Sequence, residues 1–352
     1  MLYWNISMNK KILITGGSGY FGETLTKKLI DLGYDCSVLD LNCPSKLIGQ
    51  ARYFEGDIRD YNKVNQACKD IDVIFHNVAQ VPIAKNKHLF ESVNNIGTQN
   101  ILEAAKKNKC EHFIYTSSSA IYGVPKENPV SEKTIPCPFE AYGEAKLNGE
   151  NACKNYRDNY KVSIIRPRTI LGGGRLGIFQ ILFEWIFQNQ NIPVFDNGDN
   201  IYQFIHSDDL ADACIQAMVL QVSGEFNIGA KHFGSMREAL QFLINKAEKK
   251  SKIKSFKSKN IIPFMHLSSK LGISPLGPYH AMMYGKSMYF DISKSENILN
   301  WSPKYSNEEM ILQSYNWYVK NRNIILNPES DLSAHKSAMK QKALWFLGKY
   351  LL

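Results

Sequence analysis

The sequence lacks the patterns that mark a secreted, membrane-spanning or metal-binding protein. Its seven cysteines are odd in number and include no CxxC pair, so neither a disulfide framework nor a metal site is predicted. No apolar run approaches the roughly 18 residues of a transmembrane helix. Residues 1–11 have no basic segment followed by an apolar core, so we expect no signal peptide. These absences favour a cytoplasmic location and a site without metal.

The chain does contain enough apolar residues for a large core. Hydrophobic residues make up 44% of the 352 positions, which fits one large α/β domain with a smaller second one. The formal net charge of +9 is concentrated at 246–259 and near the C-terminus. This excess favours an anionic partner near those stretches and has no bearing on the fold.

Short apolar runs alternate with helical patterns in the first half of the chain. The pattern predicts helices at 20–32 and around 145–160, and it predicts strands at 11–15, 37–41, 72–76, 113–116 and 162–166. Strands that are apolar on both faces indicate a parallel sheet covered on both sides. We therefore predict an α/β fold with a Rossmann-type, doubly wound parallel sheet and a smaller, discontinuous C-terminal lobe.

The predicted domains are a dinucleotide-binding domain at 9–168, a mixed substrate lobe at 169–320 and a tail at 333–352. The first domain takes further sheet elements from about 200–230, and 179–187 has the pattern of a buried helix. The tail has apolar residues on one helical stripe and lysines on its flanks. Such a helix suits the surface of an anionic membrane, and the alternative is a helix that packs on the protein itself or on a partner subunit.

A glycine-rich loop follows the first predicted strand. Gly16 permits a tight turn, Gly19 allows the backbone to approach a pyrophosphate, and Gly22 allows close packing of helix and strand. The helix that follows presents free N–H groups to the phosphates. Asp40 ends the second strand, where a carboxylate binds both ribose hydroxyls and repels a 2′-phosphate, so we expect NAD and not NADP. The alternative is that Asp40 only caps the next turn.

Tyr142 and Lys146 form a Y-x-x-x-K pair. Residues four apart share a helix face, so the ammonium would stabilise the phenolate and make Tyr142 a general acid–base at neutral pH. This pair alone is common on helix surfaces. Upstream, however, the hydroxyl residues 117–119 follow a strand and would lie at the carboxyl edge of the sheet, where ligands bind.

These motifs, in this order, resemble the NAD-dependent epimerase/dehydratase family of extended short-chain dehydrogenases/reductases over roughly residues 9–320. The family's catalytic hydroxyl precedes the tyrosine of a Y-G pair by four residues, which points to Ser118 beside Tyr142 and Lys146 as the catalytic set. The resemblance implies a substrate site that includes Gln80, Ser118, Ser119 and Tyr202. It implies a cofactor site formed by Gly16, Gly19, Tyr20, Phe21, Gly22, Asp40, Asp57, Ile58, Val78, Ala79, Asn94, Thr116, Tyr142, Lys146 and Pro167.

Three features depart from the family pattern. Ser119 and Ala120 stand where related dehydratases carry Asp-Glu, which argues against dehydration. Tyr202 stands where many sugar-nucleotide enzymes carry an arginine that binds the diphosphate. The chain also continues past the usual end. His206 is expected to order a loop, with Asp208 or Asp209 capping the next helix.

The predicted function is an NAD-dependent epimerase that acts on a nucleotide- or lipid-linked sugar by reversible hydride transfer at a secondary alcohol. Two alternatives stay open. One is a dehydrogenase of the 3β-hydroxysteroid type, and the other is a non-catalytic NAD-binding regulatory protein. The resemblance implies a homodimer, and we expect a small-molecule partner and no nucleic acid.

Overall fold

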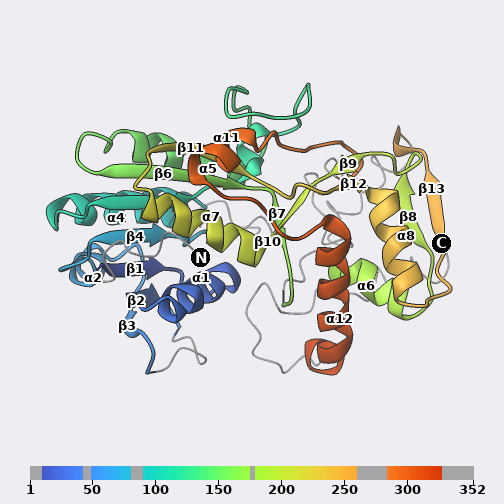
Figure 1. Ribbon diagram of the computed structural model, residues 1–352, viewed down its shortest axis with the longest axis horizontal. Coiled ribbons are helices and arrows are strands. Elements are labelled where there is room, and N and C mark those ends of the chain that lie inside the picture. Colours follow the sequence, from blue (N-terminus) through green and yellow to red (C-terminus); the bar gives the residue numbers. More distant parts are fainter. Residues whose placement is uncertain (1–9, 43–48, 81–89, 175–178, 260–283, 327–352) are drawn as a thin grey trace.

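A parallel sheet organises the N-terminal part of the chain (Figure 1). The structure is a computed structural model that describes residues 10–42, 49–80, 90–174, 179–259 and 284–326. The sheet has seven strands in the order β11-β6-β5-β4-β1-β2-β3, and every neighbouring pair is parallel. Its strands are β1 (Lys11–Thr15), β2 (Asp35–Asp40), β3 (Arg52–Glu55), β4 (Val73–His76), β5 (His112–Thr116), β6 (Lys161–Pro167) and β11 (Gly224–Ile228).

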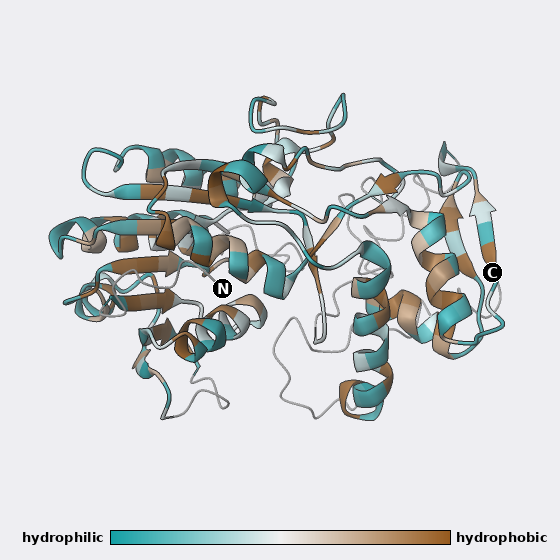
Figure 2. Cartoon of the chain, in the orientation of Figure 1, coloured by the Kyte–Doolittle hydropathy of each residue, from teal (hydrophilic) through white to brown (hydrophobic). Residues whose placement is uncertain are grey.

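Each face of the sheet has its own hydrophobic core. Alternate side chains of a strand point to opposite faces, so Ile12 and Ile14 join one core and Leu13 joins the other. The first core is covered by α1 (Tyr20–Asp31), α7 (Ser207–Val219) and α11 (Ser293–Leu299). The second is covered by α2 (Tyr61–Ala67), α4 (Gly97–Lys107) and α5 (Ala141–Lys154). Figure 2 shows the strands mostly in hydrophobic colours, as expected for a sheet buried on both faces.

A third core lies in the second lobe, to the right in Figure 1. It contains buried aromatic side chains such as Phe183, Phe204 and Tyr318. The lobe's helices are α6 (Phe179–Phe187), α8 (Met236–Lys246) and α12 (Asn307–Leu326). Its strands form three pairs, β7 (Thr169–Leu171) with β10 (Phe204–His206), β8 (Ile192–Phe195) with β13 (Ile253–Phe256), and β9 (Ile201–Tyr202) with β12 (Gly234–Ser235).

Two short helices complete the described elements. The π-helix η2 (Phe90–Ile96) leads directly into α4, and the 3₁₀-helix η3 (Ser119–Tyr122) follows β5. Both lie on the carboxyl side of a strand of the main sheet. They therefore connect strands and helices at the edge where a doubly wound sheet binds its ligand.

The predicted fold class is confirmed, and so are the five predicted strands to within two residues. The helix predicted around 145–160 was misplaced. The α5 helix begins at Ala141 because the Glu140 side chain caps it, accepting hydrogen bonds from the backbone N–H groups of Tyr142 and Gly143. It ends at Lys154, and residues 155–160 form turns. Of the region at 200–230, only β11 joins the main sheet.

Two further sequence predictions concern the C-terminal tail and membrane-spanning helices. The tail predicted at 333–352 lies outside the described residues. Among the helices that are described, none is both long enough and apolar enough to cross a membrane.

Candidate active site

The glycine loop connects β1 to α1 at the carboxyl edge of the sheet. Gly16 has a φ of +73°, which favours glycine, and Gly19 donates its backbone N–H to the Gly16 carbonyl oxygen at 3.1 Å. A Cβ on Gly22 would lie 2.0 Å from that same oxygen. Gly17, which the sequence analysis did not single out, would place a Cβ only 2.7 Å from Val38. The loop therefore requires glycine at several positions, and α1 begins directly after it, as a pyrophosphate site requires.

Asp40 ties the end of β2 to the glycine loop. Its Oδ2 accepts a hydrogen bond from the backbone N–H of Ser18 at 2.9 Å, and its Oδ1 accepts one from Leu41 at 2.7 Å. The predicted turn-capping contact is thus present. A carboxylate has about four acceptor positions, so two are left for ribose hydroxyls, and the ribose role stays a prediction.

The chain after β4 packs against the glycine loop. A Cβ on Gly16 would lie 3.0 Å from the backbone nitrogen of Val78. Asn77 accepts a hydrogen bond from the Thr116 hydroxyl at the end of β5. These contacts hold the ends of β1, β4 and β5 together, and Ala79 lies partly buried beside them.

Asn94 holds the backbone of Gln80. The Asn94 side chain accepts from the Gln80 N–H at 2.7 Å and donates to the Gln80 carbonyl at 3.2 Å. Asn94 is almost fully buried. Asn94 therefore braces the chain that follows β4, and its contact with the cofactor stays a prediction.

Asp57 and Ile58, the expected adenine-binding residues, have different surroundings. The Asp57 carboxylate pairs with the Arg59 side chain, and these hydrogen bonds lower the pKa of Asp57. Ile58 is buried against α4, where a Cβ on Gly97 would lie 2.5 Å from it. Contact of Asp57 and Ile58 with a nucleotide stays a prediction.

Tyr20 and Phe21 begin α1 and are both buried. The Tyr20 hydroxyl donates to Ser207 Oγ at 3.2 Å, in the first turn of α7. Phe21 packs in the core between the sheet and α1. Tyr20 therefore links the glycine loop to the chain that leads out of the second lobe.

Ser118 and Tyr142 are brought together by a close helix contact. Ser118 Oγ caps η3 by accepting from the Ala120 N–H at 3.1 Å. A Cβ on Gly143 would lie 2.5 Å from the Ala120 carbonyl oxygen, so the first turn of α5 lies directly against η3. Tyr142 belongs to that turn and is partly buried.

Lys146 lies one turn after Tyr142 and is 2% exposed. Its ammonium donates to the Thr116 carbonyl oxygen at 2.7 Å and lies 4.8 Å from the centre of the Tyr115 ring. Burial lowers the pKa of Lys146 to about 8. The structure therefore places a buried, titratable cation at the carboxyl end of β5.

Glu150 is a further buried charge that the sequence analysis missed. It accepts hydrogen bonds from Ser117 Oγ at 2.6 Å and from Arg166 at 2.9 and 2.6 Å. The same guanidinium donates to the Tyr122 hydroxyl at 2.8 Å. Arg166 is thus held in an internal ion pair with Glu150. Its neighbour Pro167 is the last residue of β6, at the carboxyl edge of the sheet. The four-residue spacing of Tyr142, Lys146 and Glu150 on a helix was the sequence signal that could have identified Glu150.

Arg168 occupies the predicted substrate side and was also missed. Its guanidinium donates to Ser119 Oγ at 3.0 Å and lies 4.9 Å from the centre of the Tyr202 ring. Arg168 is 2% exposed. Tyr202 in turn forms a 2.9 Å hydrogen bond with Thr169. Arg168, which directly follows β6, therefore lies beside Tyr202. Tyr202 occupies the position where many family members carry an arginine.

His206 has the expected structural role, but the expected cap is wrong. His206 itself caps α7, because its Nδ1 accepts from the Asp208 N–H at 3.1 Å. Its ring stacks on Tyr305 and its Nε2 lies 3.0 Å from Gln313. Asp209 instead accepts from the backbone N–H groups of residues 304 and 305.

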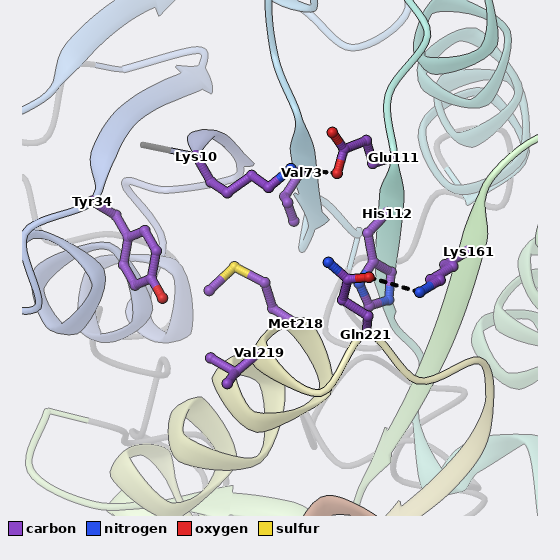
Figure 3. Close-up of a pocket in the computed structure, with 9 residues that line it drawn as sticks. All are labelled: Lys10, Tyr34, Val73, Glu111, His112, Lys161, Met218, Val219 and Gln221. Carbon is purple, nitrogen blue, oxygen red and sulfur yellow. Dashed lines mark hydrogen bonds and ion pairs between the residues drawn. The ribbon is translucent and has the colours of Figure 1, made fainter. Parts of the chain in front are cut away.

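A separate cavity lies at the opposite edge of the sheet (Figure 3). It is lined by residues at the amino ends of strands, among them Val73 of β4, His112 of β5 and Lys161 of β6. The predicted site residues lie at the carboxyl ends, so this cavity is not the candidate active site. No group of three or more His, Cys, Asp or Glu side chains suited to a metal occurs in the described ranges.

Comparisons with known proteins agree with this geometry. The chain is 50% identical over 340 residues to the uncharacterized protein y4nG of Sinorhizobium fredii, covering 96% of this chain and 85% of that protein. It is 30% identical to a putative UDP-glucose 4-epimerase of Methanocaldococcus jannaschii, covering 89% and 99%. A structure of UDP-glucuronic acid 4-epimerase from Bacillus cereus with UDP-glucuronic acid and NAD matches with a TM-score of 0.73 at 25% identity, covering 88% and 99%.

The family assignment follows from the match of a family model to residues 12–229. These residues contain the glycine loop, Asp40, Ser118 and the pair of Tyr142 and Lys146. The glycine loop leads directly into the N-terminus of α1 and the site residues lie at one edge of the sheet, so the arrangement fits NAD. The chain belongs to the NAD dependent epimerase/dehydratase family, and its cofactor is NAD.

Proposed function

We propose that the protein is an epimerase that acts on a nucleotide-linked sugar by reversible oxidation of a secondary alcohol. One observation carries the proposal. The first turn of α5 lies against η3, and this contact supports a common site for Ser118, Tyr142 and Lys146 at the carboxyl ends of the strands. The relatives named as UDP-sugar 4-epimerases support the same reaction.

Each residue of the catalytic set has a distinct role. Ser118 hydrogen-bonds the reacting hydroxyl, and Tyr142 removes its proton. Lys146 stabilises the phenolate form of Tyr142, which is the form that accepts this proton. When bound, NAD would supply reversible hydride transfer at the alcohol carbon without being consumed overall. The cofactor residues predicted from the sequence, from Gly16 to Pro167, form its proposed site.

Arg168 supports an anionic substrate. Its buried guanidinium contacts Ser119 and Tyr202, both predicted to bind substrate, and a guanidinium is suited to binding phosphate or carboxylate groups. We assign to Arg168, with Gln80, Ser119 and Tyr202, the recognition of the sugar nucleotide. Ser119 and Ala120 offer no acid–base pair, so elimination of water is not part of the proposal.

The remaining proposals concern organisation. We propose a homodimer located in the cytoplasm, with a domain boundary near residue 168 and a second lobe ending near 320. Contact of 333–352 with the inner face of the membrane rests on its amphipathic lysine-rich pattern. Such contact would bring a lipid-linked sugar within reach, and vesicle co-sedimentation with and without these residues tests it.

The proposed function is tested with a panel of substrates. Purified protein with NAD is given UDP-, GDP- and dTDP-sugars and a hydroxysteroid. Product sugars are separated by chromatography and NADH is followed at 340 nm. An isomerised sugar without NADH accumulation is expected. Steady NADH formation with the hydroxysteroid would instead indicate the dehydrogenase, and NAD binding without any turnover would indicate the regulatory protein.

A matched pair of tyrosine variants tests the acid–base. Tyr142→Phe should lower kcat by about 10²–10⁴-fold while NAD binding persists, because the fold and the cofactor loop are unchanged. Tyr61→Phe removes a hydroxyl from an exposed tyrosine on α2 and should leave kcat unchanged. Full turnover by Tyr142→Phe would refute the assignment.

A further inference from the structure

The buried pair of Glu150 and Arg166 lies directly behind the candidate catalytic residues. We propose that this pair is a neutral charge unit that sets the pH range over which Tyr142 acts, and that Glu150 and Arg166 are positioning residues. The proposal rests on the proposed function of Tyr142 and Lys146. It assigns to the pair an electrostatic role in addition to its role in packing.

Glu150 lies on the same helix as Tyr142 and Lys146, the proposed catalytic pair. Tyr142, Lys146 and Glu150 lie four residues apart on α5 and so share one face. Glu150 is fully buried and accepts two hydrogen bonds from Arg166. It also accepts from Ser117, the residue before Ser118. One carboxylate thus joins the helix of Tyr142, the strand that precedes Ser118 and the strand that ends at Pro167.

The net charge of the Glu150–Arg166 pair changes the electrostatic potential at Tyr142. With Arg166 present, the pair sums to zero and does not offset the positive charge of Lys146 at Tyr142. Without Arg166, the Glu150 carboxylate would oppose the phenolate and offset Lys146. Two helical turns separate Tyr142 from Glu150 by about 12 Å along the axis. At an effective dielectric of about 20, one uncompensated charge at that distance moves a proton equilibrium by about one pH unit.

Apart from the buried cation Arg168 beside Ser119, whose charge none of the variants removes, the other groups around Tyr142, Lys146 and Glu150 are neutral or partly exposed. Burial lowers the pKa of His76 to about 3 and raises the pKa of Tyr122 to about 12, so both stay neutral between pH 6 and 9. Burial likewise raises the pKa of Tyr115 and of Cys153. The remaining neighbours are Glu140 and Glu144 near Tyr142, and Lys154, Arg157 and Glu225 beyond Glu150.

The test compares two charge-removing variants with their combination. Glu150→Gln leaves Arg166 uncompensated and should move the acid limb of the kcat profile down by about one pH unit. Arg166→Met leaves Glu150 uncompensated and should move it up by about as much. The double variant restores neutrality and should return the limb to its wild-type position. A purely structural role predicts lower kcat in each single variant without shifts of opposite sign.

Controls separate charge from hydrogen bonding. Ser117→Ala removes one hydrogen bond to Glu150 and keeps both charges, so its profile should not shift. If a variant of Glu150 or Arg166 fails to fold, the partly exposed charges of Lys154 and Glu225 provide a second measurement of the same electrostatic effect. Lys154 lies 3.9 Å from Glu150 and 3.6 Å from Glu225. Lys154→Met should shift the acid limb up and Glu225→Gln should shift it down, each by a few tenths of a pH unit.

All profiles are measured with saturating NAD, which stabilises the native state. Shifts in the same direction, or no shifts, while Tyr142→Phe is inactive would overturn this proposal and leave the proposed function standing. Full activity of Tyr142→Phe would overturn the proposed function itself. The two failures are therefore distinguishable.

Discussion

Gly22 faces the carbonyl oxygen of Gly16 so closely that a Cβ at Gly22 would lie 2.0 Å from that oxygen. The contact joins the first turn of α1 to the start of the cofactor loop. Gly22→Ala should therefore displace the loop and weaken NAD binding by at least about tenfold, a loss on the order of 1.4 kcal/mol. Calorimetric titration with NAD measures this. Gly173→Ala is the matched control, because its Cβ would find Trp317 at an ordinary 3.6 Å.

The pKa of Lys146 predicts a loss of activity on the alkaline side. Burial lowers this pKa to about 8, so the ammonium is charged below that pH and neutral above it. The phenolate of Tyr142 loses its stabilising charge as the pH rises through 8, and kcat should decline there. Lys146→Arg keeps the charge at higher pH, so any activity it retains should persist above pH 8. A wild-type profile that stays flat to pH 10 would contradict this role.

Asp40 should control the choice of cofactor. Asp40→Asn keeps one acceptor for the loop but removes the charge, so the affinity for NAD should fall about tenfold and the preference for NAD over NADP should narrow. Calorimetric titration with NAD and with NADP provides the ratio of the two affinities. Asp35→Asn, at the exposed opposite end of β2, should leave that ratio unchanged.

Arg168 should act on substrate binding more than on chemistry. Arg168→Met removes the cation beside Ser119 and Tyr202 and should raise the KM for the sugar nucleotide roughly tenfold or more with a smaller change in kcat. Arg168→Lys should recover part of the loss because the charge remains. Arg157→Met removes a partly exposed guanidinium in the turns that follow α5 and serves as the control. A KM unaffected by Arg168→Met would remove Arg168 from the substrate site.

The glycine loop and the Y-x-x-x-K pair were predictable because their geometry is local. Tight turns depend on backbone conformation at Gly16, and a helix places Tyr142 and Lys146 on one face whatever surrounds it. The start of α5 was misplaced because the cap is Glu140, which is not one of the usual N-cap residues. The cap of α7 was missed for the same reason, since it is His206.

The sequence by itself determined the doubly wound sheet, the edge proposed to bind NAD and the residues proposed to move the proton. Hydrophobic periodicity and glycine positions act within a few residues, so they can be recognised along the chain. Only the tertiary structure decided the partners of the buried charges. Glu150 meets Arg166 across 16 positions, and Arg168 meets Ser119 across 49. A buried charge is stabilised by whichever groups the packing brings to it, and no spacing along the chain records which groups those are.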